Sequence, residues 1–217
     1  ASAMSPEFGA NPLPPGFEVI ETFCWDGARF VRLAQHVARL ERSCRALDIS
    51  FDPMHLYVRL DALPDGGALR VRVGVAADGQ VRVTHGPLVP AAPLWRVGLS
   101  ADLLRSDDPW LTIKTTQRAL YDRTRAALPE GMDEMLFCNE NAQICEGTIT
   151  SVFFDRGQGL CTPPLTCGVL PGVLRADLLQ RGACQESVLP QAELADVRLW
   201  VGNSLRGLIA AKLVCPN

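Results

Sequence analysis

The chain has 217 residues, enough for one large domain or two small ones. With 47% hydrophobic and 21% charged residues it is globular in composition, which excludes collagen-like, coiled-coil and disordered architectures. The 21 basic and 24 acidic residues leave a net charge of −3, so no excess of positive charge favours nucleic acid or an anionic membrane surface. We expect neither as a partner.

No apolar run reaches the roughly 18–20 residues that cross a bilayer, and the N-terminus lacks the basic start and hydrophobic core of a signal peptide. We therefore expect a cytoplasmic protein. Eight cysteines are present, but a disulfide framework is typical of short secreted chains. No Cys-x-x-Cys pair indicates zinc. The sequence predicts reduced, mostly buried thiols and no metal.

The basic residues are almost all arginines. Of the 21 there are 19 arginines and two lysines, Lys114 and Lys212. Arginine stays protonated, whereas a lysine amine can be tuned by burial to form a Schiff base. Any such chemistry in this chain has two candidates.

The N-terminal stretch 1–16 contains four prolines and no periodicity, and we expect a disordered arm or a remnant of expression. Residues 17–23 alternate loosely as a strand. A turn signal at Asp26-Gly27 and a second alternating run over 29–33 follow. Together these features predict a β-hairpin.

Two helices and a second hairpin are predicted next. Apolar residues recur at helical spacing over 34–47, and Asp52-Pro53 is typical of the start of a helix that continues through Leu60. Two alternating runs, 68–76 and 80–85, are joined at Asp78-Gly79.

A strand over 95–99 precedes a Ser-Asp-Asp-Pro turn signal, where we place the domain boundary. The elements predicted beyond it are a helix over 115–127, short strands over 134–139, 143–146 and 148–154, helices over 172–180 and 191–196, and a strand over 198–202 leading into 204–213.

These elements predict an α+β fold, because the strands fall in hairpins rather than in βαβ units. We expect a small N-terminal domain over 17–100, a linker over 101–112 and a larger C-terminal domain over 113–217.

Six short motifs follow one another in the second half, and two more precede them. They are Glu21-Thr22, His36–Leu40, Lys114–Arg118, Asp133-Glu134, Ile144–Thr150, Thr162–Pro164, Gly168–Arg175 and Asn203–Gly207. In this order they resemble the class IV, fold-type IV pyridoxal-phosphate enzymes, which include aminotransferases and aminodeoxychorismate lyase. The stretch Lys114–Asp122 and the terminal Asn-Ser-Leu-Arg-Gly are most similar to the aminodeoxychorismate lyase-like members. The resemblance covers residues 17–213.

The resemblance implies a two-domain fold like that of D-amino-acid aminotransferase, with pyridoxal 5'-phosphate in a cleft between the domains. It also implies a homodimer. Lys114 matches the lysine that forms the Schiff base, and the apolar neighbours Leu111 and Ile113 suit an uncharged amine. Glu146 matches the carboxylate that keeps the pyridine nitrogen protonated. Leu170 would pack against the pyridine face.

For the cofactor's phosphate, the resemblance implies Arg39 as the cation. The backbone amides of Val173 and Leu174, at the start of a predicted helix, would donate hydrogen bonds to it, and Ser204 would add a hydroxyl.

Substrates of the family carry carboxylates, for which Arg72, Arg118 and Arg206 are the candidate partners. Glu21 stands where some lyases have a threonine. Tyr121 lies two residues after the tyrosine that aminotransferases often use.

Three functions therefore stay open. The first is 4-amino-4-deoxychorismate lyase, which releases pyruvate and 4-aminobenzoate for folate biosynthesis. The second is a class IV aminotransferase of branched-chain or D-amino acids. The third is a non-catalytic domain that retains the fold, against which the set Lys114, Glu146 and Arg39 argues.

Overall fold

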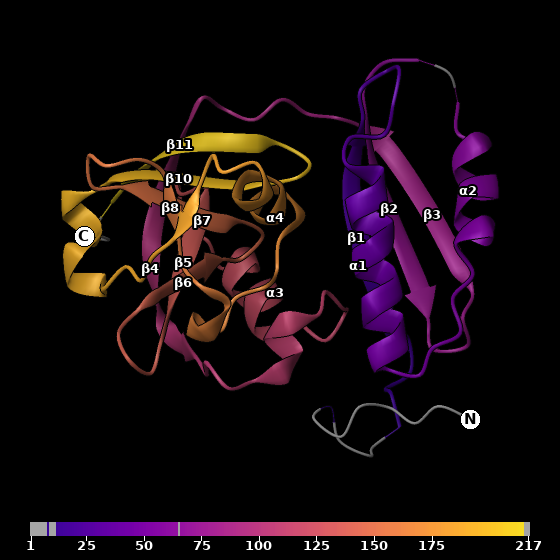
Figure 1. Ribbon diagram of the computed structural model, residues 1–217, viewed down its shortest axis with the longest axis horizontal. Coiled ribbons are helices and arrows are strands. Elements are labelled where there is room, and N and C mark those ends of the chain that lie inside the picture. The colour runs from indigo at the N-terminus through magenta and orange to yellow at the C-terminus, as the bar shows by residue number, and fades with distance from the viewer. Residues whose placement is uncertain (1–7, 9–11, 65, 215–217) are drawn as a thin grey trace. The chain divides into compact units, whose positions relative to one another are not determined.

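The computed structural model describes residues 8, 12–64 and 66–214 (Figure 1). The described residues form two compact units. Unit 1 contains those up to Val89 together with Ile113–Gln117, and unit 2 contains Pro90–Thr112 and the chain from Arg118 onward. Residues 1–7 and 9–11 of the predicted arm lie outside the described residues.

Unit 1 is an antiparallel sheet with two helices. Its strand order is β1 (Glu18–Trp25), β2 (Leu69–Ala76), β3 (Val81–Pro87). Helix α1 (Leu33–Ala46) packs against β1, and α2 (Pro53–Asp61) packs against β3. Both helices and the β2–β3 hairpin are confirmed, with ends within a few residues of those predicted.

Local chemistry explains these elements. Val71, Val73 and Val75 alternate along β2 and are fully buried, as expected for a strand with one face on a core. Asp52 caps α2, because its carboxylate accepts a hydrogen bond from the backbone N–H of Met54 at 2.9 Å.

The predicted hairpin between residues 17–23 and 29–33 is wrong. The turn exists, since Asp26 Oδ1 accepts from the N–H groups of Ala28 and Arg29. Beyond it the chain makes one isolated bridge, Trp25 to Phe30, and then enters α1. β1 pairs instead with β2, because that pairing places the buried valines of β2 in one core.

The helix predicted over 115–127 begins only at Ala119, where α3 (Ala119–Ala126) starts. The residues before it bond to β1 instead. The backbone N–H of Thr116 donates to the Glu18 carbonyl, and Thr116 Oγ1 accepts from the Glu18 N–H at 2.9 Å. Threonine hydroxyls that bond to the backbone in this way compete with a helix.

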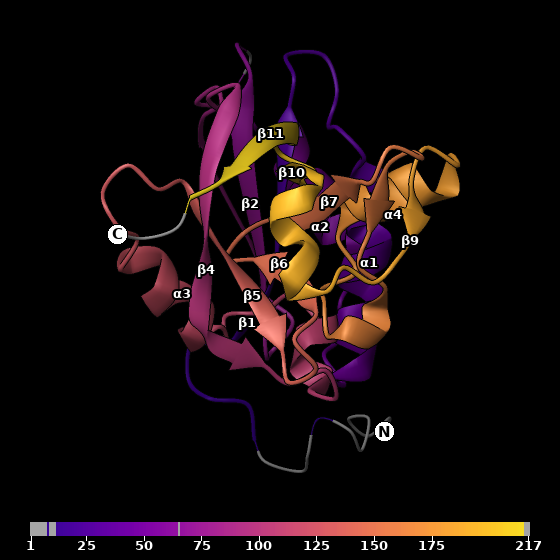
Figure 2. The same cartoon turned by 90° about the vertical axis from the view of Figure 1, so that its left-hand side faces the viewer.

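Unit 2 is built on an eight-stranded sheet that closes on itself. Its order is β10-β11-β4-β5-β6-β7-β8-β9, and a further pairing of β10 with β7 makes a six-stranded barrel from which β8 and β9 branch. Figure 2 shows β11, β4 and β5 side by side. The strands are β4 (Leu94–Leu104), β5 (Glu134–Asn139), β6 (Ile144–Gly147), β7 (Ser151–Asp155), β8 (Cys161–Thr162), β9 (Gln185–Glu186), β10 (Arg198–Asn203) and β11 (Gly207–Leu213).

Apolar side chains from these strands form the core of unit 2. Fully buried members are Val97, Leu136, Ile144, Val152, Phe154 and Val201. Helix α3 packs against β5, and α4 (Val173–Gln180) packs against β10. Three 3-10 turns complete the unit, at Pro109–Thr112, Leu165–Cys167 and Gln191–Asp196.

The predicted domain boundary is misplaced. Residues 101–104, expected in a linker, are the end of β4, which pairs with both β11 and β5. Conversely, Ile113–Gln117 belong to unit 1, although the chain on either side of them belongs to unit 2. Periodicity along the chain does not reveal such a crossing, because it depends on pairing between distant segments.

The seven described cysteines are all free, and six of them are buried. Cys215 lies outside the described residues. Within the described parts of the chain, no helix combines the length and the apolar character that crossing a membrane requires.

Candidate active site

Lys114 lies on the segment that pairs with β1. Its carbonyl accepts a hydrogen bond from the backbone N–H of Ile20 at 2.8 Å, and the next residue, Thr115, bridges to Val19. Ile113 and Thr115 on either side are buried, while Lys114 is half-buried. The lysine therefore stands on an extended, anchored backbone, which restricts where its amine can reach.

Next to Ile20 on β1, Glu21 is a fully buried carboxylate with partners on α1. Arg39 donates to it through Nε at 2.6 Å and through Nη2 at 2.7 Å. His36 Nδ1 lies 2.6 Å from Glu21 Oε2. The Glu21 carboxylate thus fixes the direction of the guanidinium, and Arg39 as the phosphate cation stays a prediction.

This arrangement has clear effects on ionisation. Burial disfavours the charged carboxylate, but the Arg39 charge and the hydrogen bonds from Arg39 and His36 outweigh it and lower the pKa of Glu21 from 4.5 to about 2. Burial lowers the pKa of His36 and is opposed by its bond to Glu21. A neutral His36 with its proton on Nδ1 satisfies the carboxylate.

The lowered pKa of Glu21 predicts a loss of stability in acid. A carboxylate with a lower pKa in the folded state stabilises above the unfolded pKa of 4.5, and this contribution disappears as the pH falls towards about 2. We expect a loss of ~3 kcal/mol in the free energy of unfolding across that range. Denaturant titrations at several pH values measure it. Below pH 4.5, the free energy of unfolding should depend less steeply on pH in Glu21→Gln than in the wild type. The surface control Glu193→Gln should keep the wild-type slope. Equal slopes in all three proteins would contradict the lowered pKa of Glu21.

In unit 2, two donors hold the carboxylate of Glu146, which is 6% exposed. The Tyr121 hydroxyl donates to Oε1 at 2.7 Å, and the Leu170 backbone N–H donates to Oε2 at 2.9 Å. The Glu146 carboxylate therefore acts as an acceptor through each of its two oxygens. The Leu170 contact found here is a backbone bond; its predicted packing on a pyridine ring stays a prediction.

Sequence reasoning missed Glu134, a fully buried carboxylate at the start of β5. It accepts from the backbone N–H groups of Thr148 at 2.9 Å and Ile149 at 3.1 Å, and from Thr150 Oγ1 at 2.9 Å. Gly147 permits this, because a Cβ there would lie 2.7 Å from Glu134 Cδ. Glu134 therefore shapes the turn directly after Glu146. Asp133-Glu134 was part of the motif set, but nothing local indicated this role.

The first turn of α4 lies close to Glu146. No side chain among the described residues caps this helix, and its first backbone bond runs from the Ala176 N–H to the Gly172 carbonyl. The N–H groups of Val173 and Leu174 thus have no acceptor within the helix. Leu170, whose N–H binds Glu146, is three residues before Val173 and four before Leu174, so at most about 14 Å of extended chain separates its N–H from these amides.

Two contacts show what surrounds this turn. A Cβ on Gly172 would lie 2.6 Å from Ser151 Oγ, and a Cβ on Gly202 would lie 3.0 Å from Leu174 Cδ2. The end of β10 is thus beside α4, and the buried Ser204 follows it in the β10–β11 turn. The structure brings Val173, Leu174 and the region of Ser204 together, and their role towards a phosphate stays a prediction.

The three arginines predicted for substrate all have partners within the chain. Arg72 binds Glu18 Oε2 at 3.1 Å. Arg118 donates to the Thr148 carbonyl at 2.7 Å and to Asp122 at 2.8 Å. The Arg206 guanidinium lies 5.9 Å from the centre of the Trp95 ring. Their roles towards a substrate stay predictions.

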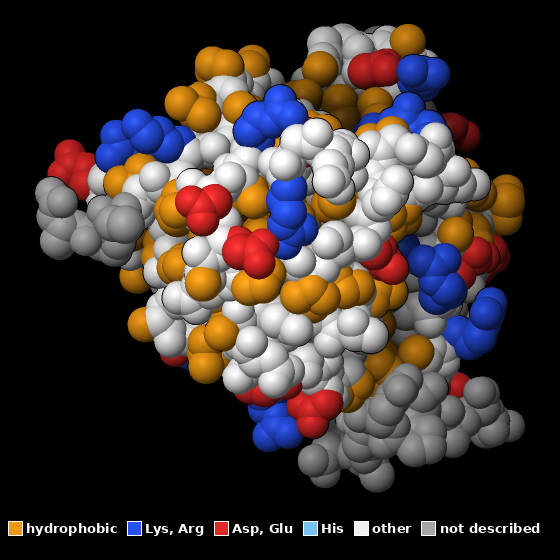
Figure 3. Space-filling model, turned by 60° about the vertical axis from the view of Figure 1, so that its left-hand side comes forward, with side chains coloured by type: hydrophobic (Ala, Val, Ile, Leu, Met, Phe, Trp, Pro, Cys, Tyr) orange, Lys and Arg blue, Asp and Glu red, His pale blue; other side chains and the backbone are white. Residues whose placement is uncertain are grey.

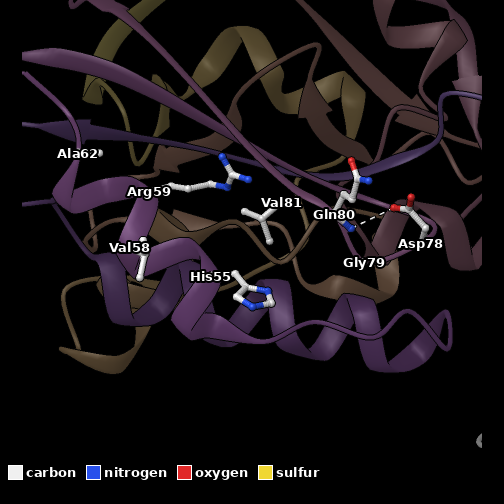
Figure 4. A pocket seen from close by; sticks show the side chains of 8 residues that line it. All are labelled: His55, Val58, Arg59, Ala62, Asp78, Gly79, Gln80 and Val81. Atoms are coloured by element: carbon white, nitrogen blue, oxygen red, sulfur yellow. Dashed lines mark hydrogen bonds between the residues drawn. The ribbon is translucent and has the colours of Figure 1, made fainter.

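A shallow groove in unit 1 contains none of the predicted site residues. It lies between α2 and the β2–β3 turn and is lined by His55, Val58, Arg59, Ala62, Asp78, Gly79, Gln80 and Val81 (Figure 4). On the face shown in Figure 3, basic and acidic side chains are interspersed.

Unit 1 thus presents an anchored lysine and a buried arginine, and unit 2 presents a carboxylate and open helix amides. A lysine, a ring-nitrogen partner and a phosphate cradle are the groups that a pyridoxal-phosphate enzyme needs. The profile of the family "Amino-transferase class IV" matches residues 18–214. The chain belongs to this family, and is a pyridoxal-phosphate-dependent enzyme of the lyase or aminotransferase type with the fold-type IV architecture.

Three relatives illustrate the range of the family. A Schizosaccharomyces pombe protein provisionally assigned as an aminodeoxychorismate lyase is 29% identical over 177 residues, 77% of this chain and 75% of its own. A Mesorhizobium loti structure provisionally assigned as an amino-acid aminotransferase is 42% identical, with a TM-score of 0.85, covering 91% of this chain and all of its own. A hypothetical aminotransferase from Mycobacterium tuberculosis in a PLP-bound form is 21% identical, with a TM-score of 0.74, covering 94% and 87%.

Proposed function

We propose that this chain is a 4-amino-4-deoxychorismate lyase, which releases pyruvate and forms 4-aminobenzoate for folate biosynthesis. The observation that carries the proposal is its similarity to the lyase assigned in S. pombe, which extends over three quarters of both chains. Lys114 on the segment bonded to β1 and Glu146 with its two donors are consistent with it.

The residues present fit pyridoxal phosphate. The fit rests on the Val173 and Leu174 N–H groups at the start of α4, which have no acceptor within the helix, and on the Glu146 carboxylate held by two donors. Val173, Leu174, Ser204 and Arg39 would hold the phosphate, because helix amides, a hydroxyl and a guanidinium all favour an anion.

When bound, pyridoxal phosphate supplies an electron-withdrawing ring that stabilises negative charge on the substrate carbon beside the amine. Glu146 would hold a proton on the ring nitrogen. Lys114 Nζ would hold the cofactor and, once released, would move the proton at that carbon as the three-carbon group departs.

Glu21 does not act on substrate in this proposal. Some lyases carry a threonine at the corresponding position, so Glu21 gives the lyase assignment no support there; both of its carboxylate oxygens bind Arg39 and His36. Glu21 instead orients Arg39.

The second candidate is an amino-acid aminotransferase. It is favoured by one observation, the 42% identity to the M. loti structure over its whole length. Lys114 would then move the same proton to a different carbon, so the residues named above serve either activity.

One assay decides between them. The purified enzyme is given aminodeoxychorismate, and separately a panel of L- and D-amino acids with 2-oxoglutarate. The proposal expects equal amounts of 4-aminobenzoate and pyruvate from the first, with Lys114→Ala inactive as control. Glutamate formation from the panel without any 4-aminobenzoate from aminodeoxychorismate would replace the lyase with the aminotransferase.

We also propose that the enzyme is a homodimer, as expected from the family resemblance. Light scattering at micromolar concentration on an active preparation tests this, and a monomer mass would refute it. The cytoplasmic location stays a prediction.

A further inference from the structure

We propose that Tyr121 is a positioning residue for Glu146, which its phenol holds in the orientation that serves the cofactor's ring nitrogen. The inference rests on the proposed use of pyridoxal phosphate by this chain. It is carried by the 2.7 Å hydrogen bond from the Tyr121 hydroxyl to Glu146 Oε1.

The direction of this hydrogen bond is fixed. Tyr121 is largely buried, and burial together with the neighbouring Glu146 carboxylate raises its pKa. The phenol therefore keeps its proton and acts as a donor. Since the Leu170 N–H donates to the other oxygen at 2.9 Å, Glu146 is held at both ends of its carboxylate.

The Tyr121 ring is itself held from two sides. It meets the ring of the fully buried Phe137 nearly edge-on, with centres 5.2 Å apart and planes at 69°. The Arg118 guanidinium lies 5.3 Å from the ring centre. A side chain fixed in this way places its hydroxyl with little freedom.

Arg118 links this arrangement to the turn after Glu146. Its Nη2 donates to the Thr148 carbonyl at 2.7 Å, and its Nε donates to Asp122 at 2.8 Å. The same turn is held from the other side by the Glu134 carboxylate. Glu146 is therefore fixed through both its side chain and the backbone that follows it.

The carboxylate acts on one atom of the cofactor, so the test compares two cofactors that differ at that atom. One is pyridoxal phosphate, and the other is its 1-deaza analogue, in which a CH group replaces the ring nitrogen. Binding to the cofactor-free protein is followed by tryptophan fluorescence. A defect in packing lowers the affinity for both cofactors alike. Loss of the Glu146 orientation lowers only the affinity for pyridoxal phosphate, which has the ring nitrogen.

We expect the wild-type protein to prefer pyridoxal phosphate over the analogue by about tenfold or more, the effect of one hydrogen bond to a charged group. In Tyr121→Phe this preference should fall at least about fivefold, with the affinity for the analogue unchanged. The matched control is Tyr57→Phe in α2, which alters the only other tyrosine and should keep the full preference.

Other outcomes would overturn the inference. A preference unchanged in Tyr121→Phe, or a parallel loss for both cofactors, would show a merely structural role. A further change when Tyr121→Phe is added to Glu146→Gln would show that the phenol acts elsewhere. Equal binding of the two cofactors by the wild type would remove Glu146 as the nitrogen partner. Binding of neither would overturn the proposed function itself, and the inference with it.

Discussion

The Lys114→Ala variant is expected to lose covalent attachment of pyridoxal phosphate completely, and activity with it, whereas Lys212→Ala keeps both. Alanine has no amine with which to hold the cofactor's aldehyde, and arginines cannot replace it because they stay protonated. The effect should be at least several orders of magnitude, since in the proposed function the amine both holds the cofactor and moves the proton.

Borohydride reduction followed by peptide mass spectrometry measures this attachment directly. The comparison is matched, because Lys114 and Lys212 are the only lysines in the chain. Lys114 is half-buried on the segment bonded to β1, and Lys212 is exposed on β11. Reduced cofactor found on the Lys114→Ala protein, at Lys212 or elsewhere, would refute the assignment.

The pattern of apolar and turn residues predicted those elements whose conformation is decided by residues close together in sequence. The helix over 34–47 has a regular apolar stripe, and in the structure Val37, Leu40 and Cys44 are buried along α1. The β2–β3 hairpin has its own turn signal at Asp78-Gly79. In both cases the residues that decide the conformation are near neighbours in sequence.

Elements decided by distant partners were missed. The segment 29–33 has strand-like alternation, but β1 takes β2 as its partner across more than forty residues. The run after Lys114 has helical spacing, but Thr115 and Thr116 bond to β1. The spacing of apolar residues along a segment does not indicate which distant strand that segment will pair with.

Motifs in the sequence also identified some residues of the candidate site but not the residues that support them. Lys114, Glu146, Val173 and Leu174 were assigned from motif order, and the structure places the last three near one another through Leu170 and Gly172. The supporting groups were not predicted in their roles. Buried carboxylates such as Glu21 and Glu134 look like ordinary charged residues until the structure shows the donors around them.

The second large effect is expected for Glu146→Gln. The variant keeps the shape of the side chain, but its amide is neutral, so it no longer stabilises a proton on the ring nitrogen. We expect the chemical step to slow by roughly tenfold or more, because a hydrogen bond to a charged group contributes about 1.5–3 kcal/mol and each 1.4 kcal/mol is a factor of ten in rate. The protein should still take up cofactor at saturating concentration, since the groups proposed to hold the phosphate do not include Glu146.

Single-turnover measurements on the cofactor-saturated variant separate the chemical step from binding. Glu186→Gln is a suitable control, because Glu186 is a half-exposed carboxylate paired with Arg175 on the same unit and has no proposed role towards the cofactor. Its single-turnover rate should equal that of the wild type. If Glu146→Gln also reacts at the wild-type rate, Glu146 is only a residue of β6, and the two donors on its carboxylate serve the fold rather than the chemistry.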